Sequence, residues 1–408
     1  MKAAKPLLRI PALILCGILL GTVLMVGAYS LRSERLTGNV RTSAQVLAQE
    51  GSLPLAVTGF LPSRVDSFSD VIMTGNTILS PYDTPLENAM RTPRLSGFDP
   101  LTELEKWLDG EPAQYNDYAR YWHGYLIFLV PMMTLMSISS VRLLLSVVLI
   151  LLLLHAGIRL SPRHGVAALL AFFVACCPQA IAASLIHESC MLIALAGVIG
   201  ASRTKRDLLP CLLTLIGMAT SFFDLFTTPL MTLVLPLSCV LIREDAQPTL
   251  KEYAGLCLCW LLGYLGMWAG KWAVGSILTG ENIFRDALAT MQERSVNADD
   301  AGDVIPFTSG FLACLHMILN PVYLLTFAAA FGVSLCATLR RAQGCCPLLS
   351  RPRLMLGLTA LMPVVWTLCI CNHSLVHSFH VYRTLSSSFF PLVLAVSPFA
   401  GARTRPLS

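Results

Sequence analysis

Charged residues are scarce in this sequence. Asp, Glu, Lys and Arg make up 13% of its 408 residues, which is about half the share found in soluble domains. So few charges do not cover a water-facing globule, and an ordinary soluble fold is therefore excluded. Runs that alternate apolar and polar residues are also lacking. Since only helices and closed barrels satisfy their backbone groups in lipid, the continuous apolar runs predict an all-α membrane protein.

Missing cysteines and missing sequence motifs argue against several further classes of function. None of the 14 cysteines lies in the two long polar segments, 31–123 and 279–304, so a disulfide framework is not predicted. A P-loop, a glycine-rich dinucleotide-binding turn and a Gly-x-Ser-x-Gly elbow are all missing. The net charge of +5 is concentrated in short loops beside apolar runs, so it does not indicate nucleic-acid binding.

The sequence is rich in long apolar runs. Hydrophobic residues make up 55% of the chain, and a helix crosses a bilayer with about 20 residues. The runs predict a polytopic helical bundle of about ten spans: 10–30, 124–158, 165–184, 188–202, 208–223, 226–242, 253–277, 308–338, 354–371 and 384–400. The second run is either one long helix broken near Pro131 or two short helices.

The positions of Lys and Arg orient the spans. Sixteen of the 29 basic residues fall in six short segments: 1–9, 159–164, 203–207, 243–252, 339–353 and 401–408. Basic loops stay on the cytoplasmic side of a membrane. Ten spans with cytoplasmic N- and C-termini place all six segments there, whereas splitting 124–158 in two would export several of them. We therefore predict one crossing over 124–158, in a bacterial inner-membrane protein whose active face is exoplasmic.

This orientation exports both polar segments. Residues 1–30 then form an N-terminal transmembrane anchor, which we expect to be retained rather than cleaved. Residues 31–123 form an exoplasmic loop, too long for a simple connection, with short helices such as the one near Leu101–Leu108. Residues 124–408 form the multi-span domain, with the second exoplasmic loop at 279–304. Membrane lipids are its expected surroundings, and its oligomeric state stays open.

Four polar clusters stand at the exoplasmic ends of the predicted spans. The first contains Asp66 and Asp70, whose spacing of four places both acids on one face of a helix. A partly desolvated carboxylate has a raised pKa and is suited to act as a general base. The alternative interpretation is a pair of solvated loop acids.

The second cluster, Arg120, Tyr121, Trp122 and His123, runs into the second span. Aromatic rings beside an arginine suit the stacking of a sugar and the pairing of a phosphate. The same composition is typical of an aromatic belt at the membrane interface, so both interpretations stay open.

The third cluster joins two short turns between spans. His187 and Glu188 lie between the third and fourth spans, and Asp224 lies between the fifth and sixth. An acid among apolar neighbours in a membrane is costly, which makes it a functional candidate. The alternative is an acid that reaches water among the lipid headgroups.

The fourth cluster follows the span that ends at residue 371. It contains Asn372, His373, His377, His380, Tyr382 and Arg383. Histidines four residues apart resemble half of a zinc site, so a divalent metal stays open although no cofactor is required. Arginine pairs well with phosphate. A polar helix end with structural histidines is the alternative.

This layout resembles the GT-C superfamily of polytopic glycosyltransferases, which take sugars from polyprenyl-phosphate donors. The resemblance rests on one N-terminal span, a long exoplasmic first loop with an acid near Asp66–Asp70, and many spans with short loops; the His-Pro-Pro motif is missing. It implies a lipid-linked sugar donor as partner and inverting transfer with Asp70, or else Asp66, as base. The third cluster would lie near the second-loop acids. Arg383, Arg120 or Arg285 would meet the leaving phosphate.

Three other functions stay open. A transporter or flippase fits Arg142 and Lys271 in apolar runs, although no internal repeat accompanies them. A lipid-linked polysaccharide polymerase is close to the leading hypothesis. A membrane O-acyltransferase would use His373 or His377 with Asn372, but the acyl donor of that family is cytoplasmic. The sequence names neither the sugar nor the acceptor.

Overall fold

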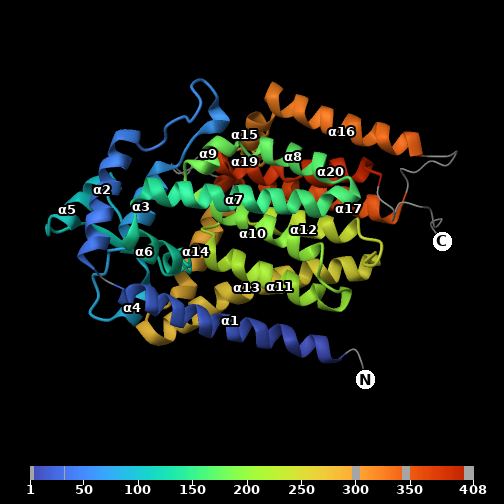
Figure 1. The fold of residues 1–408 in the computed structure, drawn as a ribbon. Helices are drawn as coiled ribbons and strands as arrows, with labels where there is room; N and C mark the ends of the chain where they lie inside the picture. The colour runs from blue at the N-terminus through green and yellow to red at the C-terminus, as the bar shows by residue number, and fades with distance from the viewer. Residues whose placement is uncertain (1–3, 32, 296–303, 342–349, 399–408) are drawn as a thin grey trace.

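The protein is a bundle of helices with a helical cap at one end (Figure 1). The structure is a computed structural model that describes residues 4–31, 33–295, 304–341 and 350–398. Six segments are long and apolar enough to cross a membrane: Arg9–Ser30 of α1 (Ala4–Ser30), α7 (Ile138–Leu160), Arg206–Phe223 containing α11 (Leu209–Phe223), α13 (Leu250–Thr279), α16 (Pro321–Arg341) and α17 (Arg351–Cys369). The chain is therefore a helical membrane protein.

Shorter apolar helices fill the bundle between these long ones. They are α6 (Leu126–Leu135), α8 (Val166–Ala175), α10 (Leu185–Ala201), α12 (Met231–Leu241), α15 (Ser309–Ile318) and α20 (Phe389–Val396). Connecting pieces are α9 (Pro178–Ala182), α14 (Ile283–Ser295), α18 (Cys371–Val376), α19 (Ser378–Ser386), η2 (Ser161–Arg163) and η3 (Arg206–Leu208). Part of the polar segment 279–304 is thus helical, and its residues 296–303 lie outside the described residues.

Several predicted spans are broken rather than continuous. The run 124–158 breaks at Ser137, whose backbone is extended, and not at Pro131, which α6 accommodates. The run 165–184 breaks before Pro178, because a residue that precedes proline is disfavoured in helical geometry. The run 308–338 breaks before Pro321 for the same reason. The last run holds only the end of α19 and the eight residues of α20.

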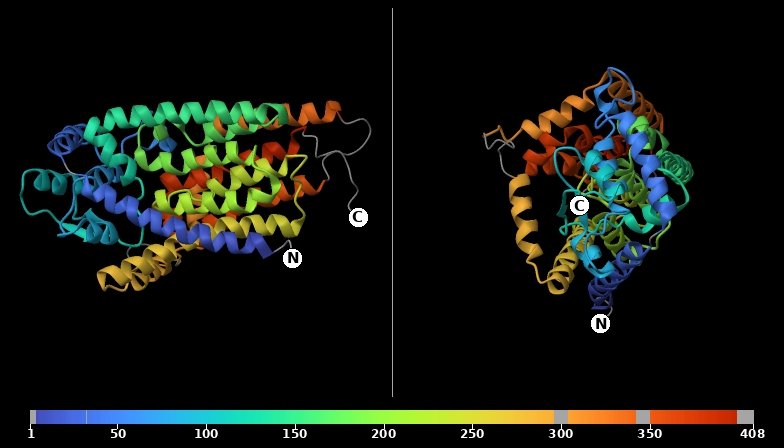
Figure 2. Two further views of the ribbon diagram at one scale, coloured as in Figure 1. Left: turned by 60° about the horizontal axis from the view of Figure 1, so that its bottom comes forward. Right: turned by 90° about the vertical axis from the view of Figure 1, so that its left-hand side faces the viewer.

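The connecting loops separate into two ends of the bundle. At one end, which we call the basic end, Arg341 contacts His164 at 2.9 Å and Arg353 donates to the carbonyl of Ser397 at 3.1 Å. Arg243 there donates to the carbonyl of Thr204 at 2.8 Å. The other end, which we call the loop end, carries residues 33–123. Figures 1 and 2 show these residues gathered beyond the long helices.

Short elements form the cap at the loop end. They are α2 (Glu34–Glu50), η1 (Leu61–Ser63), α3 (Ser67–Asn76), α4 (Pro85–Arg91), β1 (Pro93–Leu95), α5 (Pro100–Leu108) and β2 (Tyr115–Asp117). The two strands pair antiparallel with Arg94 opposite Asn116. Side chains on the inner faces of these elements join α1 and α6 in one apolar core. The cap is therefore packed onto the spans and continuous with them.

Glycines allow the closest helix contact in the bundle, between α11 and α13. A Cβ on Gly217 would lie 2.1 Å from the carbonyl oxygen of Trp260, and a Cβ on Gly263 would lie 2.1 Å from that of Thr214. Both positions therefore require glycine. Small residues let helix backbones approach in this way in membranes, where the hydrophobic effect does not drive helices together.

Two buried cations fix the cap to the spans. Arg142 of α7 donates to Oδ2 of Asp70 from Nη2 at 2.8 Å and from Nε at 3.2 Å, and its Nη1 donates to Glu50 at 2.7 Å. Lys271 of α13 donates to the carbonyls of Ala89 and Met90 at 2.6 and 2.9 Å. A charge buried in an apolar bundle is costly unless it is paired, so each cation holds its partner segment in place.

We expect Asp70→Asn to destabilise the protein by about 3 kcal/mol, because Arg142 loses its fully buried partner and keeps only the partly exposed Glu50. Denaturant unfolding of the purified protein in detergent measures this change. Asp109→Asn is the control. It breaks an ion pair with Arg41 of similar length, 2.7 Å against 2.8 Å for Asp70, but with both side chains about half exposed, and should change stability by less than about 1 kcal/mol. Equal effects would contradict an anchoring role for Asp70.

Candidate functional site

A polar cavity of about 400 Å³, which we call the chamber, lies where the cap meets the loop end of the bundle. It is lined by Leu53, Asp66, Phe68, Ser69, Ile72, Met73, Arg94, Tyr118, Arg120, Tyr121, His123, Ile186, Leu225, Thr227, Thr290, Arg294, His373, Val376, His377, Phe379 and His380. The chamber unites residues from three of the four sequence clusters, which are up to 314 positions apart (Asp66 to His380). The third cluster reaches it only through its neighbours Ile186, Leu225 and Thr227.

Among the described residues that line the chamber, Asp66 alone carries a carboxyl group. It caps α3, with Oδ1 accepting from the backbone N–H of Ser69 at 2.9 Å and Oδ2 accepting from the Ser69 hydroxyl at 2.7 Å. Burial raises the pKa of Asp66 above its usual value, although these hydrogen bonds and the Arg383 guanidinium act in the opposite direction. A carboxyl group with a raised pKa, held at a cavity wall, is placed to accept a proton.

Three histidines, His373, His377 and His380, line the chamber near Asp66. Nδ1 of His380 lies 4.0 Å from Oδ2 of Asp66. The rings of His373, His377 and His380 follow one another, with centroids 4.8 and 5.1 Å apart, and His373 contacts the carbonyl of Phe226 at 3.0 Å. Burial lowers the pKa values of His373 and His380, and the neighbouring His377 lowers both further. These two histidines are therefore uncharged at neutral pH.

The histidines are not arranged as a metal site. No group of three or more His, Cys, Asp or Glu in the described parts of the chain is placed to hold a metal ion. The predicted half-site of His373 and His377 thus gains no further ligand of these types among those residues.

Arginines and tyrosines form the opposite wall. The guanidinium of Arg120 lies 4.3 Å from the ring centre of Tyr118 and 5.7 Å from that of Tyr121, and it pairs with Asp286 at 3.2 Å. Arg94 lies over the other part of this wall, 4.3 Å from the ring centre of Tyr118. This wall can pair an anion and stack a flat apolar face.

The arginine most relevant to the chamber was missed from the sequence. Arg294 of α14 lines the chamber and donates to Oδ1 of Asn372 at 3.3 Å. Arg285, the predicted phosphate partner on the same helix, is absent from the chamber wall. The spacing of nine residues places the two arginines on different faces of a helix with 3.6 residues per turn. The amphipathic sequence pattern of α14 could therefore have indicated that Arg285 and Arg294 face different surroundings.

Several predicted site residues lie outside the chamber and have structural partners. Asp70 is fully buried in the ion pair with Arg142, and its oxygens also accept from the backbone N–H of Leu185 at 3.0 and 3.1 Å. Trp122 donates to the carbonyl of Met267 at 2.8 Å. Asp224 accepts from the backbone N–H of Thr227 at 3.0 Å. The preferred base of the sequence prediction is therefore a structural anchor, and Asp66 alone faces the chamber.

The remaining predicted site residues either make structural contacts or lie at or behind the wall of a cavity. Tyr382 donates to the carbonyl of Pro62 at 3.0 Å, and Arg383 donates to the carbonyls of Cys176 and Phe379 at 2.8 and 3.1 Å. His187 is buried behind the chamber, with its ring centre 6.1 Å from that of His380. Glu188 lines a different cavity, described next.

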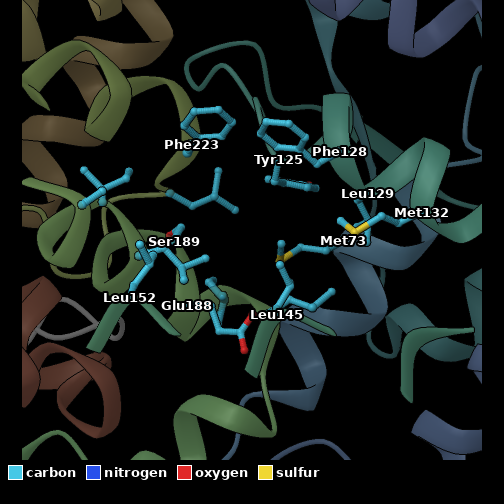
Figure 3. A pocket seen from close by; sticks show the side chains of 16 residues that line it. Met73, Tyr125, Phe128, Leu129, Met132, Leu145, Leu152, Glu188, Ser189 and Phe223 are labelled. Atoms are coloured by element: carbon cyan, nitrogen blue, oxygen red, sulfur yellow. The ribbon is translucent and has the colours of Figure 1, made fainter. Parts of the chain in front are cut away.

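Two apolar grooves adjoin the chamber. The first, which we call the lateral groove (Figure 3), holds about 320 Å³ and shares Met73, Ile186 and Leu225 with the chamber. The second, which we call the aromatic groove, holds about 190 Å³. It is bordered by Tyr121, Phe226, Trp260, Tyr264, Trp268, Trp272 and Trp366, and it shares Arg120, Tyr121, Thr290 and Arg294 with the chamber. The chamber thus shares wall residues with two apolar grooves.

We expect His123→Asn to reduce the loss of stability in acid. Burial lowers the pKa of His123 to about 3, so the folded state resists a proton that the unfolded state takes up near pH 6.5, and stability falls as the pH drops below that value. Asparagine keeps the left-handed backbone at this position, where φ is 54°. Between pH 7.5 and pH 5 the variant should lose about 2 kcal/mol less than the wild type.

Denaturant unfolding across this pH range measures the difference. The control is His316→Asn, at an exposed histidine of α15, which should leave the pH dependence of the wild type unchanged. A His123→Asn variant with the wild-type pH dependence would show that His123 takes up its proton without unfolding.

Comparison with known proteins adds no relative. No protein-family model matches the chain, and no curated protein or solved structure matches it either. The chemistry of the chamber is therefore inferred from its own described residues: the carboxyl group of Asp66, several histidines, arginines beside aromatic rings, and two adjoining apolar grooves.

Proposed function

We propose that this protein is a membrane glycosyltransferase that moves a sugar from a polyprenyl-phosphate donor to an acceptor hydroxyl in the chamber. The observation that carries the proposal is that a polar cavity, which contains an acid and arginines, shares wall residues with two apolar grooves. A water-soluble substrate needs only the polar part. A substrate with a long apolar tail needs a groove that leads from the polar site into the hydrocarbon.

The proposed orientation has ten membrane passes, with both termini in the cytoplasm and the chamber on the exoplasmic side of a bacterial inner membrane. Its support is the clustering of Arg243, Arg341 and Arg353 at the basic end, together with the presence of the chamber at the loop end. The asymmetry of basic residues sets the orientation of membrane proteins. Broken helices are tolerated in such a bundle where their free backbone groups are buried in protein.

The donor occupies the aromatic groove in this proposal. Arg120 and Arg294 stand where the groove meets the chamber, and guanidinium groups pair well with phosphate. The isoprenoid chain then lies along the wall of Trp260, Tyr264 and Trp268. The lateral groove suits the lipid phosphate less well, because the ionisable side chain in its wall is an acid, Glu188.

Asp66 is the proposed base. It takes the proton from the acceptor hydroxyl, and the hydroxyl oxygen forms a bond to the anomeric carbon from the face opposite the phosphate. The bond between that carbon and the phosphate oxygen breaks with its electron pair, so the lipid phosphate leaves and the configuration inverts. Arg120 and Arg294 meet the charge that develops on the phosphate. The uncharged His380 beside Asp66 leaves the carboxylate available for the proton.

We expect Arg294→Gln to weaken the binding of farnesyl phosphate about tenfold, because a charge-assisted hydrogen bond is replaced by a neutral one. Isothermal titration of the purified protein in nanodiscs measures the affinity. Arg285→Gln, on the same helix but outside the chamber wall, removes the same charge and should leave the affinity within about twofold. Equal weakening in both variants would indicate only a general attraction of the anion to α14.

We expect Asp66→Asn to lower kcat about 10²–10⁴-fold, the usual consequence of losing a general base. Asparagine caps a helix as well as aspartate does, so α3 should remain folded. Asp99→Asn, the same change at the cap of α5, is the matched control and should retain activity. Transfer from a panel of polyprenyl-phosphate sugars to membrane extract measures turnover.

The wild-type rate should fall on acidification at a pH above the usual range of aspartate, because the base must be ionised and its pKa is raised. Full activity of Asp66→Asn would rule out the proposed base. Binding of farnesyl phosphate without turnover of any donor would leave a lipid-binding protein in place of a transferase.

A further inference from the structure

Glu188 is a buried acid that neither the fold nor the proposed mechanism uses. It lies near the start of α10 and is 1% exposed. Neither of its carboxyl oxygens has a hydrogen-bond partner among the residues that the structure describes. Buried polar groups are almost always paired, and an unpaired one costs free energy. An unsatisfied carboxyl group in the wall of a cavity therefore indicates a missing ligand more than a structural role.

The nearest buried cation does not supply that partner. Arg142 directs its donors to Asp70 and Glu50. Apart from Glu188, the side chains that line the lateral groove are almost all apolar, with Ser189 and Tyr125 as the polar exceptions. The Tyr125 hydroxyl already contacts Asn76 at 3.1 Å and His123 at 3.0 Å. Figure 3 shows Glu188 beside Leu145 on the wall of this groove.

The shape and lining of the lateral groove indicate what kind of ligand would contact Glu188. Its walls come from α6, α7 and α10. Exposed side chains such as Phe128 open it towards the membrane, and Met73, Ile186 and Leu225 are common to it and the chamber. A ligand with its chain in the groove would have its head in the chamber. Glu188 would then lie beside the boundary between chain and head.

We propose that the lateral groove binds the acceptor, and that the acceptor is an amphiphile with a hydroxyl or amide N–H at the boundary between its apolar chain and its head. Glu188 accepts a hydrogen bond from that group, and the head presents its reacting hydroxyl to Asp66. A phosphate at the boundary is disfavoured, because no Lys or Arg is among the described residues that line the groove and an unpaired charge is costly to bury. This assignment rests on the proposed transferase function, and it makes both substrates membrane lipids.

A photoreactive N-acylethanolamine tests the assignment. Its amide N–H and hydroxyl stand at the boundary of a C16 chain that carries a diazirine, and the matching methyl ester lacks both donors. Each probe is added to the full-length protein in nanodiscs, irradiated, and located by mass spectrometry of the labelled peptides. In the wild type the N-acylethanolamine should label peptides of α6, α7 and α10 about tenfold more than the ester does.

Substitution of the acid provides the decisive comparison. Glu188→Leu fills nearly the same volume and removes the acceptor oxygens, so it should lower labelling by the N-acylethanolamine to the level of the ester. Glu188→Gln keeps one acceptor oxygen and should retain most of the labelling, which protects the test if the leucine variant folds poorly. Ser189→Ala, in the same wall, should change nothing. Equal labelling of the wild type and Glu188→Leu by the N-acylethanolamine, or labelling outside the groove, would overturn the proposal.

The donor site is measured separately. Glu188→Leu should bind farnesyl phosphate like the wild type, because the aromatic groove is unchanged. If farnesyl phosphate fails to bind the wild type while the labelling depends on Glu188, the lateral groove is a lipid site and the proposed donor is wrong. If farnesyl phosphate binds and the labelling ignores Glu188, the transferase proposal survives and the acceptor assignment fails.

Discussion

The ion pair between Arg142 and Asp70 is the interaction on which the site depends. A guanidinium inside an apolar bundle must be paired, and here its partners come from α2 and α3 of the cap. This requirement fixes the start of α3 against α7 and α10. Asp66 caps the same helix one turn before Asp70, so the pairing that buries one acid holds the other at the chamber wall. The two acids thus have different roles because their surroundings differ.

The chamber combines properties that are seldom found together at a membrane surface. His373 and His380 are buried and uncharged, Asp66 has a raised pKa, and Arg94 and Arg120 lie against the ring of Tyr118. Burial disfavours the charged form of both groups. It therefore raises the pKa of an acid and lowers the pKa of a histidine. In the proposed mechanism, proton acceptance at Asp66 and anion binding at Arg120 are therefore separated across one cavity, and the adjoining grooves would provide apolar surface for the chains of lipid substrates.

Much of the architecture followed from the sequence because composition and charge act locally. An apolar run favours the membrane through its own composition, so helices such as α1, α11 and α13 were predicted close to their bounds. The breaks were harder, because Pro131 remains inside a helix while Ser137 ends one. Proline lowers the stability of a helix, but its neighbours in space determine whether the helix continues. The pairing of Asp70, the preferred base of the sequence prediction, was equally hard to foresee, since its partner Arg142 lies 72 positions away.

By itself, the sequence determined that the chain is a helical membrane protein and which residues carry charge near the ends of its spans, because hydropathy and charge belong to each residue. Only the tertiary structure decided which of those residues meet. It placed Asp70, Trp122 and Arg383 in structural contacts and left Asp66, Arg120 and the histidines at a cavity. It also placed Arg294 in the chamber and Glu188 in a groove without a partner. The physical reason is that burial and pairing depend on packing between distant segments, which local sequence patterns do not encode.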